Sequence, residues 1–327
     1  MVTSAWRALR RRILTPSMTE TKLSTRGFFV KSPDARELLE TVGEMFLTGY
    51  AYAAEARDPL DAEARLEELP RQFRGFAYEG AGMGFAVRDG LPFGGTSHVA
   101  RFLEGEASKH IYMVYVGVGW AMARVPGFRW SKLHAPDPLL RWLALDGYGF
   151  HQAYFATDMY VHEQHQERDF RWPADGPRWY AQRVIDQGVG RAMWFVCGTD
   201  AELVADLIDK FPEIRRADLY SGAGLAATYA GGAEEDELRL LRFRAGPHAP
   251  MVAQAGAFAA TARVEAGLVV PHTRLATRIL CGTTPESAAA LCDRVRPDDP
   301  LGGEMPGYEV WRQRIAAELN ERQGVQP

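Results

Sequence analysis

Apolar residues recur at helical spacing along most of the chain. Residues 36–56 (RELLETVGEMFLTGYAYAAEA), 201–211 (AELVADLIDKF) and 285–295 (PESAAALCDRV) place them three or four positions apart. Proline or acidic residues mark the starts of these segments, which is typical of helix N-termini. Residues 110–118 (HIYMVYVGV) have strand propensity, but they align with a segment of helical pattern, described next. The pattern therefore predicts a mostly α fold.

The chain also resembles itself at intervals of about 70 residues. The segment VGVGWAM at 116–122 recurs as QGVGRAM at 187–193 and, further upstream, as LTGYAYA at 47–53. A second element, RGFAYEGAG at 74–82, recurs as RADLYSGAG at 216–224, with DGYGFH at 146–151 between them. A degenerate copy of the first element begins at Met251. These matches predict a helical array of three to four modules.

Glycine and alanine at matched helical positions indicate close approach between helices, because glycine in an exposed helix interior is unfavourable by about 1 kcal/mol relative to alanine. We divide the chain into a basic N-terminal arm at 1–25, a single helical repeat domain at 26–312 and a flexible C-terminal tail at 313–327. The glycines do not indicate a dinucleotide site, because no apolar strand precedes them and no acidic residue follows at the required spacing.

Charge and motif content exclude several classes of protein. The 327 residues carry a net charge of -4, so the chain lacks the cationic excess of a nucleic-acid binder. Its three cysteines form no CxxC pair, which favours a reducing, cytoplasmic location. The sequence contains no GxxxxGK[ST], GxSxG or HExxH motif. It has no apolar stretch long enough for a transmembrane helix.

The N-terminal arm is the basic part of the chain. Its apolar residues fall at helical spacing between arginines, and they are Trp6, Leu9, Ile13 and Leu14. One interpretation is an amphipathic helix that rests on a partner protein or on an anionic membrane surface. The other is a solvated tail that docks weakly on the acidic body.

Polar residues that depart from the repeat are the candidates for function. Three positions after the repeated tyrosine, the copies have Ala81, His151 and Ala223. One position after it, they have Glu79, Gly149 and Ser221. If these helices converge on one cavity, the candidate catalytic residues are His151, Glu79 and Tyr148, and the candidate substrate-binding residues include Tyr78, Tyr220 and Ser221. The alternative is that the histidine and the glutamate are partnered structural groups.

Two other features suggest binding sites. Residues 112–180 are rich in aromatic side chains, and we expect Trp120 and Trp142 to line a channel for a flat conjugated ligand unless they are ordinary core residues. His162 and His165 have the spacing of metal ligands on one helix face. Their charged surroundings favour a solvated loop instead, so we assign no metal and leave the cofactor open.

Five short motifs together resemble one known family. They are RILTPS at 12–17, RGF at 26–28, RGFAYEG at 74–80, DGYGFH at 146–151 and DLYSGAGL at 218–225. The chain resembles the bacterial proteins of unknown function encoded in enediyne biosynthetic gene clusters, often called UnbL-like. This resemblance implies a role beside an iterative polyketide synthase, in converting a linear polyene into a polyyne or a cyclic enediyne core. The family has no assigned catalytic residues, so none are transferred.

Three functions are consistent with these observations. The first is an enzyme of enediyne core maturation that uses His151 as an acid or base, with Tyr148 or Tyr220 as hydroxyl donors. The second is a non-catalytic protein that binds the polyene or polyyne intermediate, or a scaffold that recruits other proteins encoded in the cluster. The third is a metal-dependent oxidative enzyme that uses His162 and His165.

Overall fold

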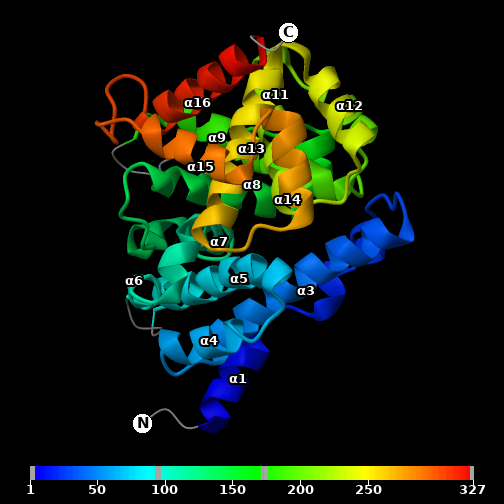
Figure 1. Ribbon diagram of the computed structural model, residues 1–327. Coiled ribbons are helices and arrows are strands. Elements are labelled where there is room, and N and C mark those ends of the chain that lie inside the picture. Colours follow the sequence, from blue (N-terminus) through cyan, green and yellow to red (C-terminus); the bar gives the residue numbers. More distant parts are fainter. Residues whose placement is uncertain (1–3, 93–96, 171, 173–175, 325–327) are drawn as a thin grey trace.

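Helices, and no β-strands, make up the regular secondary structure of the residues that the computed structural model describes, which are 4–92, 97–170, 172 and 176–324 (Figure 1). The predicted α class is confirmed, and residues 111–122 form a helix despite their strand propensity. The long helices are α3 (Pro33–Glu55), α5 (Arg71–Gly90), α7 (Ile111–Met122), α8 (Leu143–Phe155), α9 (Arg178–Val196), α11 (Glu213–Tyr229), α13 (Ala249–Glu265) and α16 (Gly307–Gly324). Shorter helices surround them: α1 (Ser4–Leu14), α2 (Leu23–Arg26), α4 (Pro59–Leu66), α6 (His98–Phe102), α10 (Ala201–Ile208), α12 (Glu235–Ala245), α14 (Pro271–Ala276) and α15 (Pro285–Arg294).

Seven of the long helices pack in chain order, each against the next: α3, α5, α7, α8, α9, α11 and α13. Gly-x-Gly pairs determine how closely they approach. In α8, a Cβ added at Gly147 would lie 2.0 Å from the carbonyl oxygen of Val116 in α7, and one at Gly149 would lie 2.2 Å from that of Ile185 in α9. The first glycine of each pair thus contacts the preceding helix and the second contacts the following one. The other pairs are at 80 and 82, 117 and 119, 188 and 190, and 222 and 224.

This arrangement gives the predicted small-residue faces a physical role. The matched glycines sit at equivalent contacts along one continuous array. Whether the array consists of repeated 70-residue modules stays a prediction.

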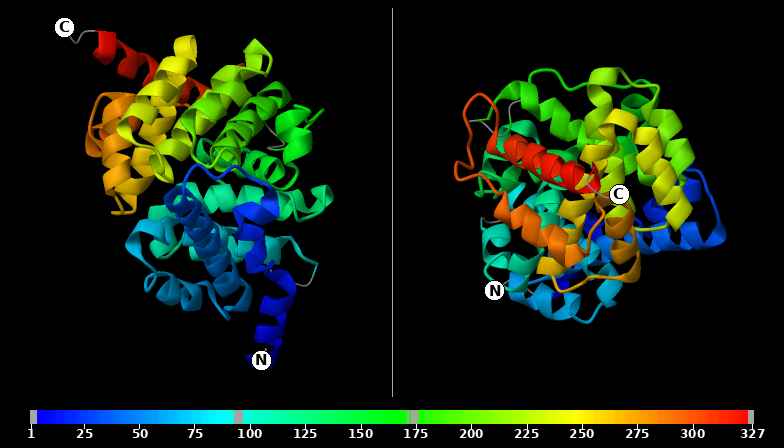
Figure 2. Two further views of the ribbon diagram at one scale, coloured as in Figure 1. Left: turned by 90° about the vertical axis from the view of Figure 1, so that its right-hand side faces the viewer. Right: turned by 45° about the horizontal axis from the view of Figure 1, so that its top comes forward.

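The array curves back on itself. Arg263 of α13 donates hydrogen bonds to the carbonyl oxygens of Gln72, 2.9 Å away at the start of α5, and of Tyr229, 2.7 Å away at the end of α11. Helix α13 also contacts α7. Figure 2 shows α9, α11 and α13 side by side, with α3 and α5 across one end of the group. The central helices consequently surround a common interior.

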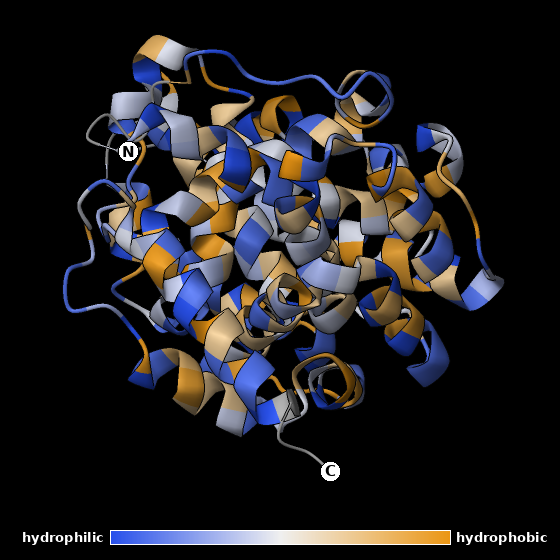
Figure 3. Cartoon of the chain, turned by 90° about the horizontal axis from the view of Figure 1, so that it is seen from above, coloured by the Kyte–Doolittle hydropathy of each residue, from blue (hydrophilic) through white to orange (hydrophobic). Residues whose placement is uncertain are grey.

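Polar residues gather on the peripheral loops, and apolar residues recur along the helices (Figure 3). None of the described helices has both the length and the apolar character required to cross a bilayer. The structure differs from the predicted flexible tail at 313–327, because α16 continues to Gly324 and buries Ile315 and Leu319. Residues 325–327 lie outside the described part of the chain.

The basic N-terminal arm contains helix α1. Arg10 anchors it by donating hydrogen bonds to the carbonyl oxygens of Ala54 and Ala56 at the end of α3. Arg11 forms an ion pair with Glu55, with an N to O distance of 2.9 Å. The helix therefore docks on the body, and Figure 1 shows it extending from α3 toward the N-terminus.

Candidate functional site

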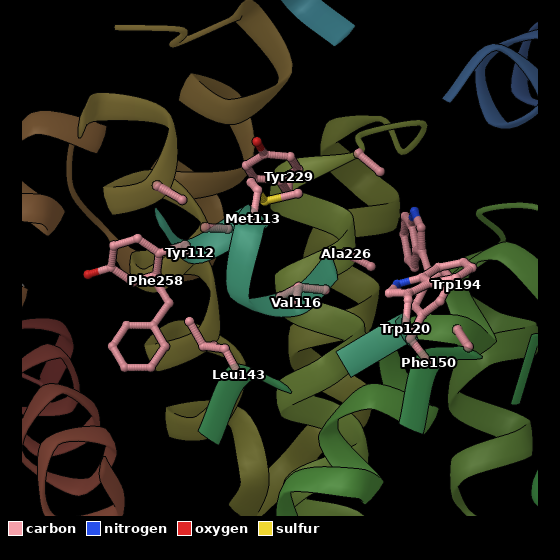
Figure 4. Close-up of a cluster of buried hydrophobic side chains, with 14 of the residues drawn as sticks. Tyr112, Met113, Val116, Trp120, Leu143, Phe150, Trp194, Ala226, Tyr229 and Phe258 are labelled. Atoms are coloured by element: carbon pink, nitrogen blue, oxygen red, sulfur yellow. The ribbon is translucent and has the colours of Figure 1, made fainter. Parts of the chain in front are cut away.

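A cavity lies in the interior that the array encloses. Helices α3, α5, α7, α8, α9 and α11 contribute to its wall, and Pro16, Glu20 and Thr21 line it from the N-terminal segment. Its empty space is about 900 Å³, including open solvent at the mouth. The aromatic residues that line it are Phe46, Phe76, Trp120, Phe150, Tyr154, Phe155, Phe195 and Tyr229. Figure 4 shows Trp120 and Phe150 close together and, at a separate position, Met113 beside Tyr229; all four residues line the cavity.

Three of the polar side chains that line this cavity come from α5, α8 and α9. Glu79 directly precedes Gly80 in α5, His151 lies two residues after Gly149 in α8, and Arg191 directly follows Gly190 in α9. Each is therefore within one turn of a glycine that allows close backbone contact with a neighbouring helix. All three are buried, with at most 8% of each residue exposed.

Glu79 belongs to a buried group of charges with one guanidinium between two carboxylates. Arg191 Nη2 lies 2.9 Å from Oδ1 of Asp146 and 3.8 Å from Oε1 of Glu79. Gln187 donates a hydrogen bond of 2.8 Å to the other carboxylate oxygen of Asp146. Burial raises the pKa of Glu79 to about 7; Arg191 opposes this shift and Asp146 adds to it. Glu79 is thus present in both its neutral and its anionic form near neutral pH.

His151 is a neutral imidazole at neutral pH. Burial lowers its pKa to about 4, although a hydrogen bond with Gln152 raises it in part. Its Nδ1 lies 3.3 Å from Oε1 of Gln152. Its ring packs edge-on against Trp120, with centroids 5.5 Å apart. Since the Nε1 of Trp120 donates a hydrogen bond of 3.0 Å to Glu79, one indole contacts both candidate groups.

The three repeated tyrosines lie outside the cavity. The hydroxyls of Tyr78, Tyr148 and Tyr220 donate hydrogen bonds to Glu67, Glu167 and Asp209, at 2.8, 2.7 and 3.0 Å. In α5 the residues that line the cavity are Phe76, Glu79 and Met83, at i, i+3 and i+7, and Tyr78 falls on another face. The tyrosines connect their helices to neighbouring segments.

Two other candidate substrate-binding residues are also placed elsewhere. Ser221 is buried and its Oγ donates to Oε1 of Gln254 at 3.3 Å. Trp142 is buried and packs edge-on against Tyr180, with ring centroids 5.0 Å apart. The structure therefore brings together Glu79, His151 and Trp120, but does not bring the predicted tyrosines, Ser221 or Trp142 into the same cavity.

His162 and His165 have the spacing of metal ligands, although we assigned no metal to them. Among the described residues, no group of three or more His, Cys, Asp or Glu side chains is arranged to hold a metal ion. His162 and His165 follow α8 in a short helical turn and the loop after it, where the ring of His165 packs against Tyr160.

Arg191 is the residue that the sequence reasoning missed. The repeat contained a signal for it, because the residue after the second glycine is Trp120 in α7 and Arg191 in α9, and Gly49 of α3 is followed by Tyr50. An arginine in place of an aromatic residue is the same kind of departure that identified His151.

The comparisons with known proteins identify one family. The model described as "Protein of unknown function (DUF1702)" matches residues 5–319, which is nearly the whole chain. Neither a curated protein nor a solved structure is significantly similar to it.

Proposed function

We propose that this chain, which belongs to the DUF1702 family whose model it matches, binds an elongated conjugated small molecule in its aromatic cavity and transfers protons to or from it through Glu79. The observation that carries the proposal is the combination of this aromatic wall with a buried carboxyl group whose pKa is about 7.

The cavity wall matches a flat, apolar ligand. Trp120 packs against Phe46 and Phe150, with ring centroids 4.4 and 5.1 Å apart. Aromatic faces and edges of this kind bind conjugated π systems through dispersion and quadrupole contacts. Few polar groups interrupt the wall, as is usual for sites that bury most of a small molecule.

The polar groups supply acid–base chemistry. A carboxyl group with a pKa of about 7 both takes up and releases protons at neutral pH, which is the range in which general acid–base catalysis is most efficient. When Glu79 takes a proton, its negative charge disappears, and Arg191 can stabilise negative charge that develops on the ligand. Moving a proton along a conjugated chain in this way requires no oxidant.

The structure changes the role that we assign to His151. The sequence suggested this histidine as the principal acid or base, but a pKa of about 4 means that it carries no proton to donate as a cation at neutral pH. We propose that His151 acts as a neutral hydrogen-bonding partner of the ligand and Glu79 as the group that exchanges the proton.

We further propose a linear polyene or polyyne of enediyne biosynthesis as the ligand. Two of the five motifs that carry the family resemblance contribute to the wall of the cavity. The motif at 74–80 contains Glu79, and the motif at 146–151 contains His151. A conjugated hydrocarbon chain also has the shape and polarity that this wall accepts.

A second proposal concerns helix α1, which we suggest brings the protein to an anionic membrane surface. Trp6, Leu9 and Ile13 are 52%, 45% and 67% exposed, and they lie on one face of the helix. Arg12 flanks this face, and the segment that follows α1 lines the cavity. A basic amphipathic helix of this kind is typical of peripheral membrane binding, and it would bring the cavity close to a source of apolar ligand.

The proposal for the cavity is tested by incubating the protein with a linear conjugated polyene and following absorbance and mass. We expect binding, with a spectral change that develops with time in the wild type and in the control Glu213→Gln, whose side chain is exposed, but not in Glu79→Gln. Binding without any chemical change would contradict the acid–base role and would indicate that the protein is a non-catalytic carrier of the polyene. Absence of binding would contradict both parts of the proposal.

A further inference from the structure

A chain of hydrogen bonds connects His151 to a carboxylate outside the cavity. Glu167 Oε1 accepts from the hydroxyl of Tyr148 at 2.7 Å and also from the hydroxyl of Tyr160. Gln152 Nε2 lies 3.3 Å from the first hydroxyl oxygen and 3.0 Å from the second. The side-chain oxygen of Gln152 then lies 3.3 Å from Nδ1 of His151.

The direction of each hydrogen bond in this network follows from the presence of Glu167 at its end. A carboxylate only accepts hydrogen bonds, so the protons of both tyrosine hydroxyls point toward it. Burial, together with Glu167, raises the pKa of Tyr148 and raises that of Tyr160 to about 12. Both hydroxyls therefore keep their protons at neutral pH.

The orientation of the Gln152 amide is then determined. The two hydroxyl oxygens have donated their protons to Glu167 and can only accept from Gln152. The NH₂ group has two protons, one for each tyrosine, so it must face them. The amide oxygen is left facing His151, where it can only accept. Nδ1 of the imidazole must consequently carry the proton.

We propose that Gln152 is a positioning residue. Glu167 orients the Gln152 amide through the two tyrosine hydroxyls, and the amide oxygen then holds neutral His151 as the tautomer protonated at Nδ1. This tautomer leaves an unshared electron pair on Nε2, the ring nitrogen that no residue of the described chain donates to. His151 then presents a hydrogen-bond acceptor to the cavity, and the ligand must bring a donor, either an O–H group or an acidic C–H bond, to that point. The assignment of the tautomer stands on its own, whereas its use toward a ligand rests on the function proposed above.

The repeat supplies a matched control. Tyr78 makes the same kind of contact as Tyr148, since its hydroxyl donates to Glu67 at 2.8 Å. The residue four positions after the tyrosine is Gly82 in α5 but Gln152 in α8. Tyr78 stacks on His110, with ring centroids 3.8 Å apart, but of these two tyrosines only Tyr148 is linked to a histidine through hydrogen bonds among the described residues.

The test is long-range ¹H–¹⁵N NMR of the full chain labelled with [¹⁵N]histidine, without ligand. The His151 signals are assigned by their loss in His151→Gln. We expect the wild type and Tyr78→Phe to show His151 mainly protonated at Nδ1. Gln152→Leu should give a mixture of both tautomers or a change to the Nε2-protonated form.

A second variant keeps the proposal falsifiable if Gln152→Leu does not fold. Glu167→Leu leaves Gln152 intact but removes the acceptor that orients both hydroxyls, so the same loss of tautomer preference is expected. A wild-type signal protonated at Nε2, or an unchanged tautomer in a folded Glu167→Leu variant, would overturn the assignment. Because no ligand is present, such a failure is distinct from a failure of the proposed function.

Discussion

Nε1 of Trp120 donates a hydrogen bond of 3.0 Å to Oε1 of Glu79, and both residues line the cavity. The bond favours the anionic form of a carboxyl group that burial otherwise holds neutral. The indole therefore contributes both to the apolar wall and to the protonation of the acid–base group.

Removing this hydrogen bond should raise the pKa of Glu79 further. Trp120→Phe keeps an aromatic side chain in the wall but has no N–H group to donate. We expect the titration of Glu79, followed by ¹³C NMR of the side-chain carboxyl, to move to higher pH than in the wild type. Trp142→Phe is the control, because Trp142 is buried without contact to Glu79. A Glu79 titration that is unchanged in Trp120→Phe would contradict the role of the indole.

The raised pKa of Glu79 also predicts how stability depends on pH. The folded state binds this proton up to a pH of about 7, whereas the unfolded chain releases it near 4.5. The stability contributed by the protonated form is fully present below 4.5 and is lost as pH rises through 7. Glu79→Gln cannot lose that proton, so its free energy of unfolding relative to wild type should increase between pH 4.5 and 8, by about 3 kcal/mol.

Urea unfolding of both proteins at several pH values measures this difference. Taking the difference cancels the contributions of His110, His151 and His272, whose lowered pKa values have the opposite pH dependence. A difference between the two proteins that stays constant with pH would show that Glu79 titrates normally.

The close helix contacts predict a large effect from a single methyl group. A Cβ at Gly80 would lie 1.9 Å from the carbonyl oxygen of Phe46, so Gly80→Ala must push α3 and α5 apart. We expect a loss of about 3 kcal/mol in unfolding free energy. Gly303→Ala, at a site where an added Cβ meets nothing within 4 Å, should leave stability nearly unchanged. Equal stability of the two variants would refute the packing role.

Helix α1 should bind anionic vesicles. We expect the protein to co-sediment with vesicles that contain phosphatidylserine, more weakly as salt increases, and not with purely zwitterionic vesicles. Replacing Trp6, Leu9 and Ile13 with serine should reduce the bound fraction several-fold. Ile214→Ser and Phe243→Ser serve as controls, because these side chains are 87% and 81% exposed but lie outside α1. Equal binding by the triple variant and the controls would rule out α1 as the contact.

The sequence predicted the helices and part of the site for identifiable reasons. Glu79 and His151 stood out because they replace small residues at repeated positions, and the structure places both in one cavity. The same comparison would have identified Arg191. The tyrosines were candidates for the cavity but lie outside it, for the opposite reason. Residues common to every copy maintain the fold, as the contact of Tyr78 with Glu67 shows.

Other features could not be read from the sequence. The cavity exists because the array curves until Arg263 reaches the carbonyl oxygen of Gln72, a contact between residues 191 positions apart. Local spacing carries no information about such a contact. The pKa of Glu79 likewise depends on Asp146 and Arg191, which reach it from two other helices.

The most direct test of the central claim is deuterium incorporation. The protein is incubated with a linear methyl-terminated polyene in D₂O, and the recovered polyene is analysed by mass spectrometry. If Glu79 exchanges protons with the bound chain, the wild type and Glu213→Gln will introduce deuterium into the polyene, and Glu79→Gln will not. Recovery of unlabelled polyene from the wild type, or equal labelling by Glu79→Gln, would contradict the account.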